Sequence, residues 1–235
     1  MAFSSLAEID AYMKTNKCEF WEAVIREEAR DSQQPEMDIV NRMTQMYRSM
    51  KEADEAYDDS LTSRSGLSGK NGKKMADYAA THKCMCGKFG GAVMARAIKM
   101  AESNACMKRI VAAPTAGSCG VVPAILITYE RMTNTSENDM VKALFVAAGI
   151  GDVIARRASI SGARGGCQAE IGTACAMAAA ALAELFEMGI DQIEYAAEVS
   201  LEHHLGLTCD PVCGLVQIPC IERNAVAAMR ALNGL

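Results

Sequence analysis

The sequence predicts an all-α fold, and three observations lead to that prediction. Apolar residues recur at helical spacing along most of the 235 residues. No stretch shows the sustained apolar–polar alternation that is typical of a half-buried strand. Sixteen methionines and few aromatic residues suit a helical core that is filled by flexible side chains. Neither a dinucleotide-binding fingerprint nor a Walker motif is present to indicate a nucleotide-binding α/β fold.

Two amphipathic helices are expected before residue 60. The first is predicted over residues 5–30 and the second over 36–59, with a break at Pro35 because proline disfavours helix at the residue before it. A heptad-like seam of the second helix comprises Val40, Met43, Tyr47, Met50 and Tyr57. We interpret residues 1–60 as a helical arm, which either docks to a partner or covers the catalytic domain of residues 61–235.

Helical periodicity continues through the rest of the chain, interrupted by turns that are rich in Gly, Ser and Thr. A helix is predicted over residues 73–83, and another follows Gly90 and Gly91. Ser136 is a good N-cap for one later helix, and Asp191 contributes to the cap of another. The further helices are expected up to about residue 103 and over 121–132, 137–148, 151–158, 169–188, 191–205 and 220–235.

Two Gly-rich segments between these helices carry groups that could hold a ligand. Residues 62–72 expose many backbone N–H groups and hydroxyls, which can bind a carboxylate or phosphate, although composition alone favours a linker. Residues 110–120 place Thr115, Gly117 and Ser118 before the next helix, whose dipole favours an anion. The alternative for this second turn is ordinary helix capping.

Ten cysteines in a chain without a recognisable signal peptide make a disulfide framework improbable, so metal ligation, catalysis or packing remains. Residues 159–170 bend at several glycines around Cys167, and Cys209, Cys213 and Cys220 follow in a second bent loop. Thiolates suit zinc and iron–sulfur clusters. Cys209 and Cys213 could form one zinc knuckle, but no second pair stands near Cys167. The spacing therefore favours an iron–sulfur site with one open iron.

Charge and hydropathy exclude other classes of partner. The net charge is −5 and no basic block is present, so nucleic acid is not expected as a partner. The longest apolar runs are too short and too rich in alanine to span a bilayer, so no membrane association is expected. These features predict a cytoplasmic enzyme.

Several strings of the chain resemble the iron–sulfur-dependent bacterial L-serine dehydratases, and specifically their α subunit. The resemblance covers most of residues 62–233 in family order, and the N-terminal helices match more loosely. The strings are Ser65-Gly-Leu-Ser-Gly69, Pro114-Thr-Ala-Gly-Ser118, Ser159-Ile-Ser-Gly-Ala163, Gly165-Gly-Cys-Gln-Ala-Glu170, Leu205-Gly-Leu-Thr-Cys-Asp-Pro211 and Gly214-Leu-Val-Gln-Ile-Pro-Cys220.

The resemblance implies a lyase that works without pyridoxal phosphate and converts L-serine into pyruvate and ammonia, in serine degradation and gluconeogenesis. It assigns a [4Fe–4S] cluster to Cys167, Cys209 and Cys220, with the fourth iron open to substrate, and it leaves Cys213 as a bystander. The residues implied to hold the substrate are Ser65, Ser68, Gly69, Thr115, Gly117 and Ser118. The family also implies a β subunit or β domain as a partner, in a homo- or hetero-oligomer.

The resemblance leaves the catalytic base open. His82, His203 and His204 are the candidates, although a lone histidine near a site is more often a hydrogen-bonded support, and the β part could supply the base. The chain departs from relatives at two places. Lys70 stands where many relatives have another glycine, and its side chain either helps to hold a carboxylate or points into solvent. The end at Leu235 suggests a catalytic domain that is shortened at its C-terminus. The alternatives are an L-cysteine desulfidase of related type and a noncatalytic metal-binding subunit.

Overall fold

The computed structural model describes residues 3–81 and 83–235, and over these ranges it is helical with no β-strand, which confirms the all-α prediction. A single isolated bridge joins Val212 and Leu215. The elements are α1 (Leu6–Asn16), α2 (Phe20–Ser32), α3 (Glu36–Glu55), α4 (Asn71–Ala79), α5 (Gly87–Ala105), the 3-10 helix η1 (Ala116–Ser118), α6 (Val121–Thr133), α7 (Glu137–Arg157), α8 (Gly162–Leu185), α9 (Ile190–Glu202) and α10 (Ile218–Asn233).

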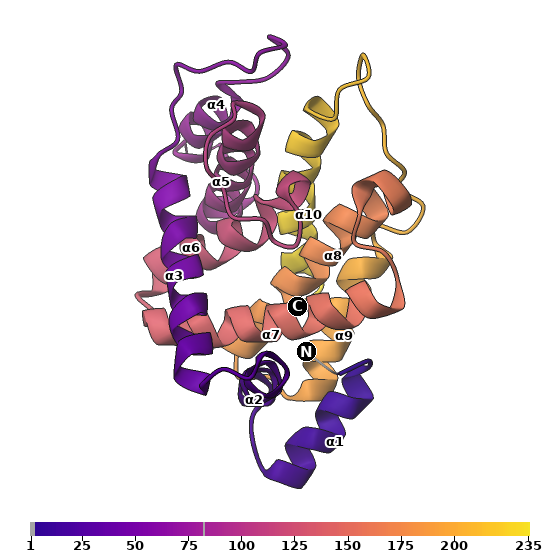
Figure 1. Ribbon diagram of the computed structural model, residues 1–235. Helices are drawn as coiled ribbons and strands as arrows, with labels where there is room; N and C mark the ends of the chain where they lie inside the picture. Colours follow the sequence, from indigo (N-terminus) through magenta and orange to yellow (C-terminus); the bar gives the residue numbers. More distant parts are fainter. Residues whose placement is uncertain (1–2, 82) are drawn as a thin grey trace.

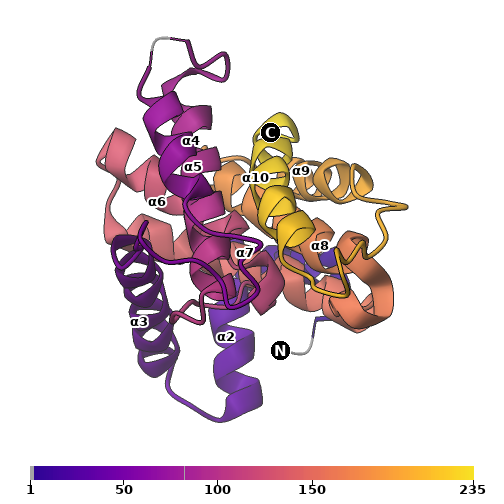
Figure 2. The same cartoon turned by 90° about the horizontal axis from the view of Figure 1, so that it is seen from above.

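Helix α7 crosses the middle of the molecule, and the other helices pack around it in two groups (Figure 1). Helices α2 and α3 pack on α7, and α8 packs on both α7 and α9. At the other end, α5 packs against α4, α6 and α10. Seen from above, α10 lies between α5 and the pair of α8 and α9 (Figure 2). The loop before α10 and the loop before α4 reach the same end of the molecule (Figure 1).

The centre of the core is α8, whose residues from Ile171 to Ala183 are all buried. A helix that is apolar on every side belongs in the interior, and alanine lets neighbouring helices approach closely. Glycines of α7 serve the same purpose. A Cβ on Gly149 would lie 2.7 Å from the Phe20 ring, and one on Gly151 would lie 2.9 Å from the Met177 sulfur. Close helix packing therefore depends on small residues at these crossings.

The structure corrects several helix boundaries. The helix predicted over residues 73–83 is α4, which ends at Ala79, and the helix expected to follow Gly90 and Gly91 begins at Gly87. The predicted helix over residues 5–30 is two helices, because Lys17 adopts a left-handed conformation and Glu19 forms a reciprocal cap with Glu22. The two helices expected over residues 137–148 and 151–158 are one continuous helix, since its glycines are packing positions and not breaks. The helix expected to reach residue 59 ends at Glu55.

The N-terminal helices share the core of the rest of the chain. Phe20, Val24, Tyr47 and Met50 are buried in the same hydrophobic cluster as α6, α7 and α8. In the part of the chain that the structure describes, every helix is too short or too polar to cross a lipid bilayer.

Candidate functional site

The backbone breaks at Gly166, inside the segment that carries Cys167. Gly166 has φ 72° and ψ −167°, a conformation that is essentially restricted to glycine. A Cβ at this position would lie 2.9 Å from the Cys209 amide nitrogen and 3.0 Å from the Thr208 Cα. The glycine therefore permits two segments that are about forty residues apart in sequence to touch, and it sets Cys167 at the start of the straight part of α8.

Two hydrogen bonds also join the Cys167 segment to the loop that carries Cys209. The Gln168 amide donates to the Leu207 carbonyl at 2.8 Å, and the Gly206 amide donates to Gln168 Oε1 at 2.9 Å. The first cysteine segment and the start of the second cysteine loop thus form one unit at the end of α8.

Arg223 connects this unit to α10. Its Nη1 donates to the Cys167 sulfur at 2.9 Å and to the Thr208 carbonyl at 3.0 Å. Its Nη2 lies 3.6 Å from a carboxylate oxygen of Asp210. Cys220, the third predicted ligand, lies one turn earlier on the same helix α10. Arg223 therefore places a positive charge beside the sulfur of Cys167, and metals bind cysteine as the thiolate.

The surroundings of Cys220 favour the neutral thiol over the thiolate. Burial raises the pKa of Cys220 to about 12, and the negative charges of Cys167, Glu170 and Cys209 act in the same direction. A metal cation at this position would favour the Cys220 thiolate, because coordination to a metal deprotonates a thiol. The three cysteine sulfurs are soft metal ligands, so the chemistry of these residues fits an iron–sulfur cluster or zinc.

The sulfurs do not stand in coordinating positions. Within residues 3–81 and 83–235, no three His, Cys, Asp or Glu side chains are grouped closely enough to hold a metal ion. Cys167 is buried, Cys220 is half-buried and Cys209 is exposed, as is Cys213. Convergence of Cys167, Cys209 and Cys220 on one metal position stays a prediction, and it requires rotation of the Cys209 loop.

The serine loop before α4 is joined to the second cysteine loop by Gln217. The hydroxyls of Ser63, Ser65 and Ser68 all donate to Gln217 Oε1, at 3.0, 2.6 and 3.4 Å. Gln217 precedes α10 and stands three residues before Cys220. Two of the predicted substrate residues, Ser65 and Ser68, are thereby tied to the chain segment that carries two predicted metal ligands.

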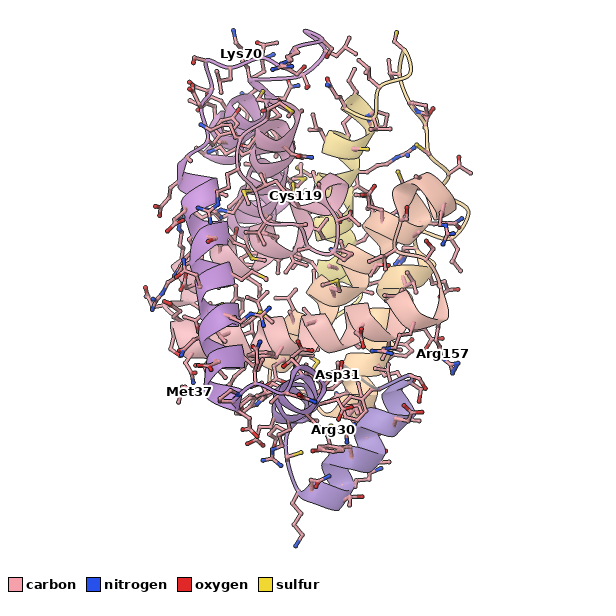
Figure 3. All side chains as sticks on the ribbon, viewed as in Figure 1. Arg30, Asp31, Met37, Lys70, Cys119 and Arg157 are labelled. Carbon is pink, nitrogen blue, oxygen red and sulfur yellow. The ribbon has the colours of Figure 1, made fainter. Side chains whose placement is uncertain are left out.

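The ends of the serine loop are fixed by separate contacts. Gly69 has φ 140°, and a Cβ there would lie 2.5 Å from the Leu61 carbonyl oxygen. The buried Glu102 carboxylate accepts the amide hydrogens of Asn71 and Gly72 at 2.8 and 2.9 Å. Lys70 is exposed at the end of the molecule, while Cys119 lies in its interior (Figure 3). Of the two positions expected for Lys70, the solvent-facing one is observed.

The turn of Thr115, Gly117 and Ser118 packs between α8 and α10. Thr115 and Ser118 cap the 3-10 helix reciprocally, as the capping alternative expects. Asn224 of α10 fixes the turn, because its Nδ2 donates to the Gly117 carbonyl at 2.7 Å and its Oδ1 accepts from the Gly120 amide at 2.8 Å. The Thr115 hydroxyl donates to Glu170 of α8.

A cavity of about 210 Å³ joins these segments. It is lined by Gly117 of the turn, by Gln217, which holds the serine loop, and by Cys220, together with α5 residues including Asn104. A larger cavity of about 620 Å³ lies between α3, α4, α5 and α6, and none of the predicted site residues that the structure describes lines it. The smaller cavity is therefore the candidate site.

The histidine candidates differ in environment. His204 is buried, its Nδ1 lies 3.0 Å from the Ser200 carbonyl oxygen, and burial lowers its pKa. His203 is exposed, and its carbonyl accepts a hydrogen bond from Arg230 at 2.6 Å. His82 lies outside the described residues. Sequence reasoning assigned no role to Arg223, Gln217 or Glu170, although Gln217 and Glu170 stand inside the strings that carry the resemblance.

Comparisons with known proteins identify the family of this chain. Residues 15–235 match the family model of the serine dehydratase alpha chain. A probable L-serine dehydratase alpha chain of Bacillus subtilis strain 168 is 36% identical over 98% of this chain and 77% of its own length. L-serine dehydratase 2 of Escherichia coli strain K12 is 51% identical over 58% of this chain, which matches 30% of the relative's length. L-serine dehydratase of Streptomyces coelicolor is 52% identical over the same shares. The chain belongs to the serine dehydratase alpha chain family.

Proposed function

We propose that the chain is the α subunit of an L-serine dehydratase and that it holds a [4Fe–4S] cluster through Cys167, Cys209 and Cys220. The observation that carries the proposal is the family match, together with the contact of Gly166 with Cys209 and the link from Gln217 to the serine loop. When bound, the cluster supplies an open iron, a Lewis acid that makes the β-hydroxyl a better leaving group.

The protein's own residues would hold the amino acid for this reaction. The residues proposed to bind its carboxylate and amine by hydrogen bonds are Ser65, Ser68, Gly69, Thr115, Gly117 and Ser118. L-serine loses the α-proton and the β-hydroxyl as one molecule of water. The resulting aminoacrylate tautomerises, takes up water and gives pyruvate and ammonia. Pyridoxal phosphate is not required in this scheme.

The α-proton needs a base, which we propose to be one of His82, His203 and His204 or a group of the β subunit. The buried ring of His204, with Nδ1 at the Ser200 carbonyl, suits a support better than a base. We propose that the α and β subunits work as an oligomer in the cytoplasm. All ten cysteines are free, which suits a reducing compartment.

Anaerobic purification with the β partner, followed by cluster reconstitution and a serine-to-pyruvate assay, tests the proposal. Pyruvate formation together with about four irons per chain is the expected result. Sulfide release from L-cysteine without pyruvate from L-serine would instead identify an L-cysteine desulfidase. Zinc without iron and without lyase activity would identify a noncatalytic metal-binding subunit.

A further inference from the structure

The carboxylate of Glu170 occupies a space that two glycines leave open. A Cβ on Gly117 would lie 2.6 Å from Glu170 Oε1, and a Cβ on Gly162 would lie 2.6 Å from Oε2. Any other residue at either position would displace the carboxylate. The Thr115 hydroxyl donates to Oε1 and fixes its orientation. Three segments of the chain thus prepare one position for a negative charge.

This charge has no cation beside it. Over the described residues, no Lys, Arg or His nitrogen forms an ion pair with Glu170, and Oε2 accepts no hydrogen bond. Two buried carboxylates elsewhere in the core, Glu102 and Asp54, have more polar partners. Glu102 accepts three hydrogen bonds, and Asp54 pairs with Arg96 and Arg131. A half-buried carboxylate with one hydroxyl donor retains the capacity to bind a cation.

The position of Glu170 links it to the candidate site. It lies one turn after Cys167 on α8, and it contacts the turn of Thr115 and Gly117. Gly117 also lines the cavity that contains Cys220 and Gln217. Asp210 is another carboxylate in the cysteine loops that could bind a cation. Its side chain is 71% exposed and lies 3.6 Å from Arg223 Nη2. Asp210 is therefore more exposed than the half-buried Glu170 and is paired with a cation, whereas Glu170 has no cationic partner among the described residues.

We propose that Glu170 binds the α-ammonium group of the substrate and so selects amino acids over hydroxy acids; this proposal rests on the proposed function. Amino acids are zwitterions, and the hydroxyls and amides of the serine loop and the turn suit the carboxylate end. A carboxylate at Glu170 completes the set with a charge-assisted hydrogen bond to the other end. Two anchored ends would orient the Cα–H and the β-hydroxyl between Glu170 and the cavity that Gly117, Gln217 and Cys220 line.

L-alanine and L-lactate test the proposal without turnover, because they differ only in the ammonium group and neither carries a β-hydroxyl. Calorimetric titration would use the reconstituted α and β subunits. We expect the wild-type protein to bind L-alanine about 10- to 100-fold more tightly than L-lactate, the range of a hydrogen bond to a charged group. Glu170→Gln removes the charge at nearly constant volume and should reduce this preference to near unity. The control Glu194→Gln, at an exposed position of α9, should keep it.

Activity and iron content separate the proposed roles. Glu170→Gln should raise the KM for L-serine by about 10- to 100-fold and keep the iron content. Glu170→Asp keeps the charge and should retain a measurable preference for L-alanine. An unchanged preference in Glu170→Gln, or equal binding of both ligands by the wild-type protein, would overturn the proposal. If the wild-type protein prefers L-alanine but forms no pyruvate from L-serine, the proposed activity fails while the ammonium role stands. Loss of iron in Glu170→Gln with retention of iron in Glu170→Asp would also overturn the proposal, because the charge would then serve the cluster and not the substrate ammonium.

Discussion

Arg223 Nη1 lies 2.9 Å from the sulfur of Cys167, a contact between α10 and α8 across 56 positions of sequence. The same nitrogen binds the Thr208 carbonyl, so one side chain orients the first predicted ligand and holds the loop of the second. Groups that orient metal ligands commonly influence metal affinity as strongly as some ligands do.

Replacement of Arg223 by alanine should therefore weaken the cluster. The sulfur of Cys167 loses its positive neighbour, and residues 208–210 lose their anchor to α10. We expect a 10- to 100-fold loss of metal affinity, the range that is typical of such partners. Iron content after anaerobic dialysis against a chelator measures it. Arg230→Ala is the control. Arg230 lies on the same helix as Arg223, but it donates to the His203 carbonyl at the end of α9. Equal iron retention by both variants would contradict the assigned role of Arg223.

Gln217→Ala should release the serine loop. Three hydroxyls lose their common acceptor, so the amide hydrogens of residues 63–68 should exchange about 10-fold faster, which corresponds to about 1.4 kcal/mol of lost protection. Hydrogen exchange measured by mass spectrometry reports the change. The KM for L-serine should rise as well if the loop holds the substrate. Glu222→Ala, at an exposed position on the next turn of α10, is the control and should leave exchange in the loop unchanged.

Gly166→Ala tests the close approach of the two cysteine segments. Both the positive φ and the 2.9 Å contact with the Cys209 nitrogen oppose a side chain at this position. We expect a decrease in the free energy of unfolding of about 1–3 kcal/mol from the backbone conformation, together with loss of the cluster. Gly87→Ala is a matched control, because Gly87 has φ 68° but no atom within 4 Å of an added Cβ. A stable Gly166→Ala protein with full iron content would show that the contact is dispensable.

Glu184 on α8 gives a prediction of pH dependence. Burial, together with the negative charge of Glu19, raises the pKa of Glu184 to about 7, although Lys142 opposes the shift. The folded state therefore keeps this proton more readily than the unfolded state, whose pKa is near 4.5. The stability that this proton contributes is present at pH 4 and is lost as the pH rises through 7.

Glu184→Gln should remove this dependence. At pH 8 the variant should be more stable than the wild-type protein by about 1–2 kcal/mol, discounted for partial exposure, while at pH 4.5 the two should be nearly equal. Urea denaturation at both pH values measures the free energies of unfolding. A variant that is less stable than the wild-type protein at pH 8 would contradict the assignment.

Local signals in the sequence predicted most of the helices but not all of their ends. The apolar periodicity of α6 and α10 is clear, α8 reads as a long run of small apolar residues, and Ser136 is the observed N-cap of α7. The break at Lys17 was missed because neither Lys17 nor Cys18 disfavours helix by itself; the cap formed by Glu19 and Glu22 ends the continuity. Gly149 and Gly151 look like a break but are positions of close packing.

Only part of the candidate site could be predicted, because local motifs identify loops but not the contacts between them. The Gly-rich motifs identified the cysteine loops, the serine loop and the Thr115 turn. The contacts of Arg223 with Cys167, of Gln217 with the serine loop and of Glu170 with Thr115 join segments that are 56, about 150 and 55 residues apart. Such contacts depend on how the helices pack, and no local pattern encodes them. The cluster geometry depends additionally on the metal itself.

The ligand set of Cys167, Cys209 and Cys220 is the central claim, and Cys209 and Cys213 test it most directly. Both are exposed on one loop, four residues apart, so substitution of either should have a similar effect on folding. The decisive measurement is the iron content and visible absorbance of the anaerobically reconstituted Cys209→Ala and Cys213→Ala proteins. We predict that Cys209→Ala loses the cluster, whereas Cys213→Ala keeps about four irons per chain and its activity. Full cluster retention in Cys209→Ala, or loss in Cys213→Ala alone, would contradict the ligand set.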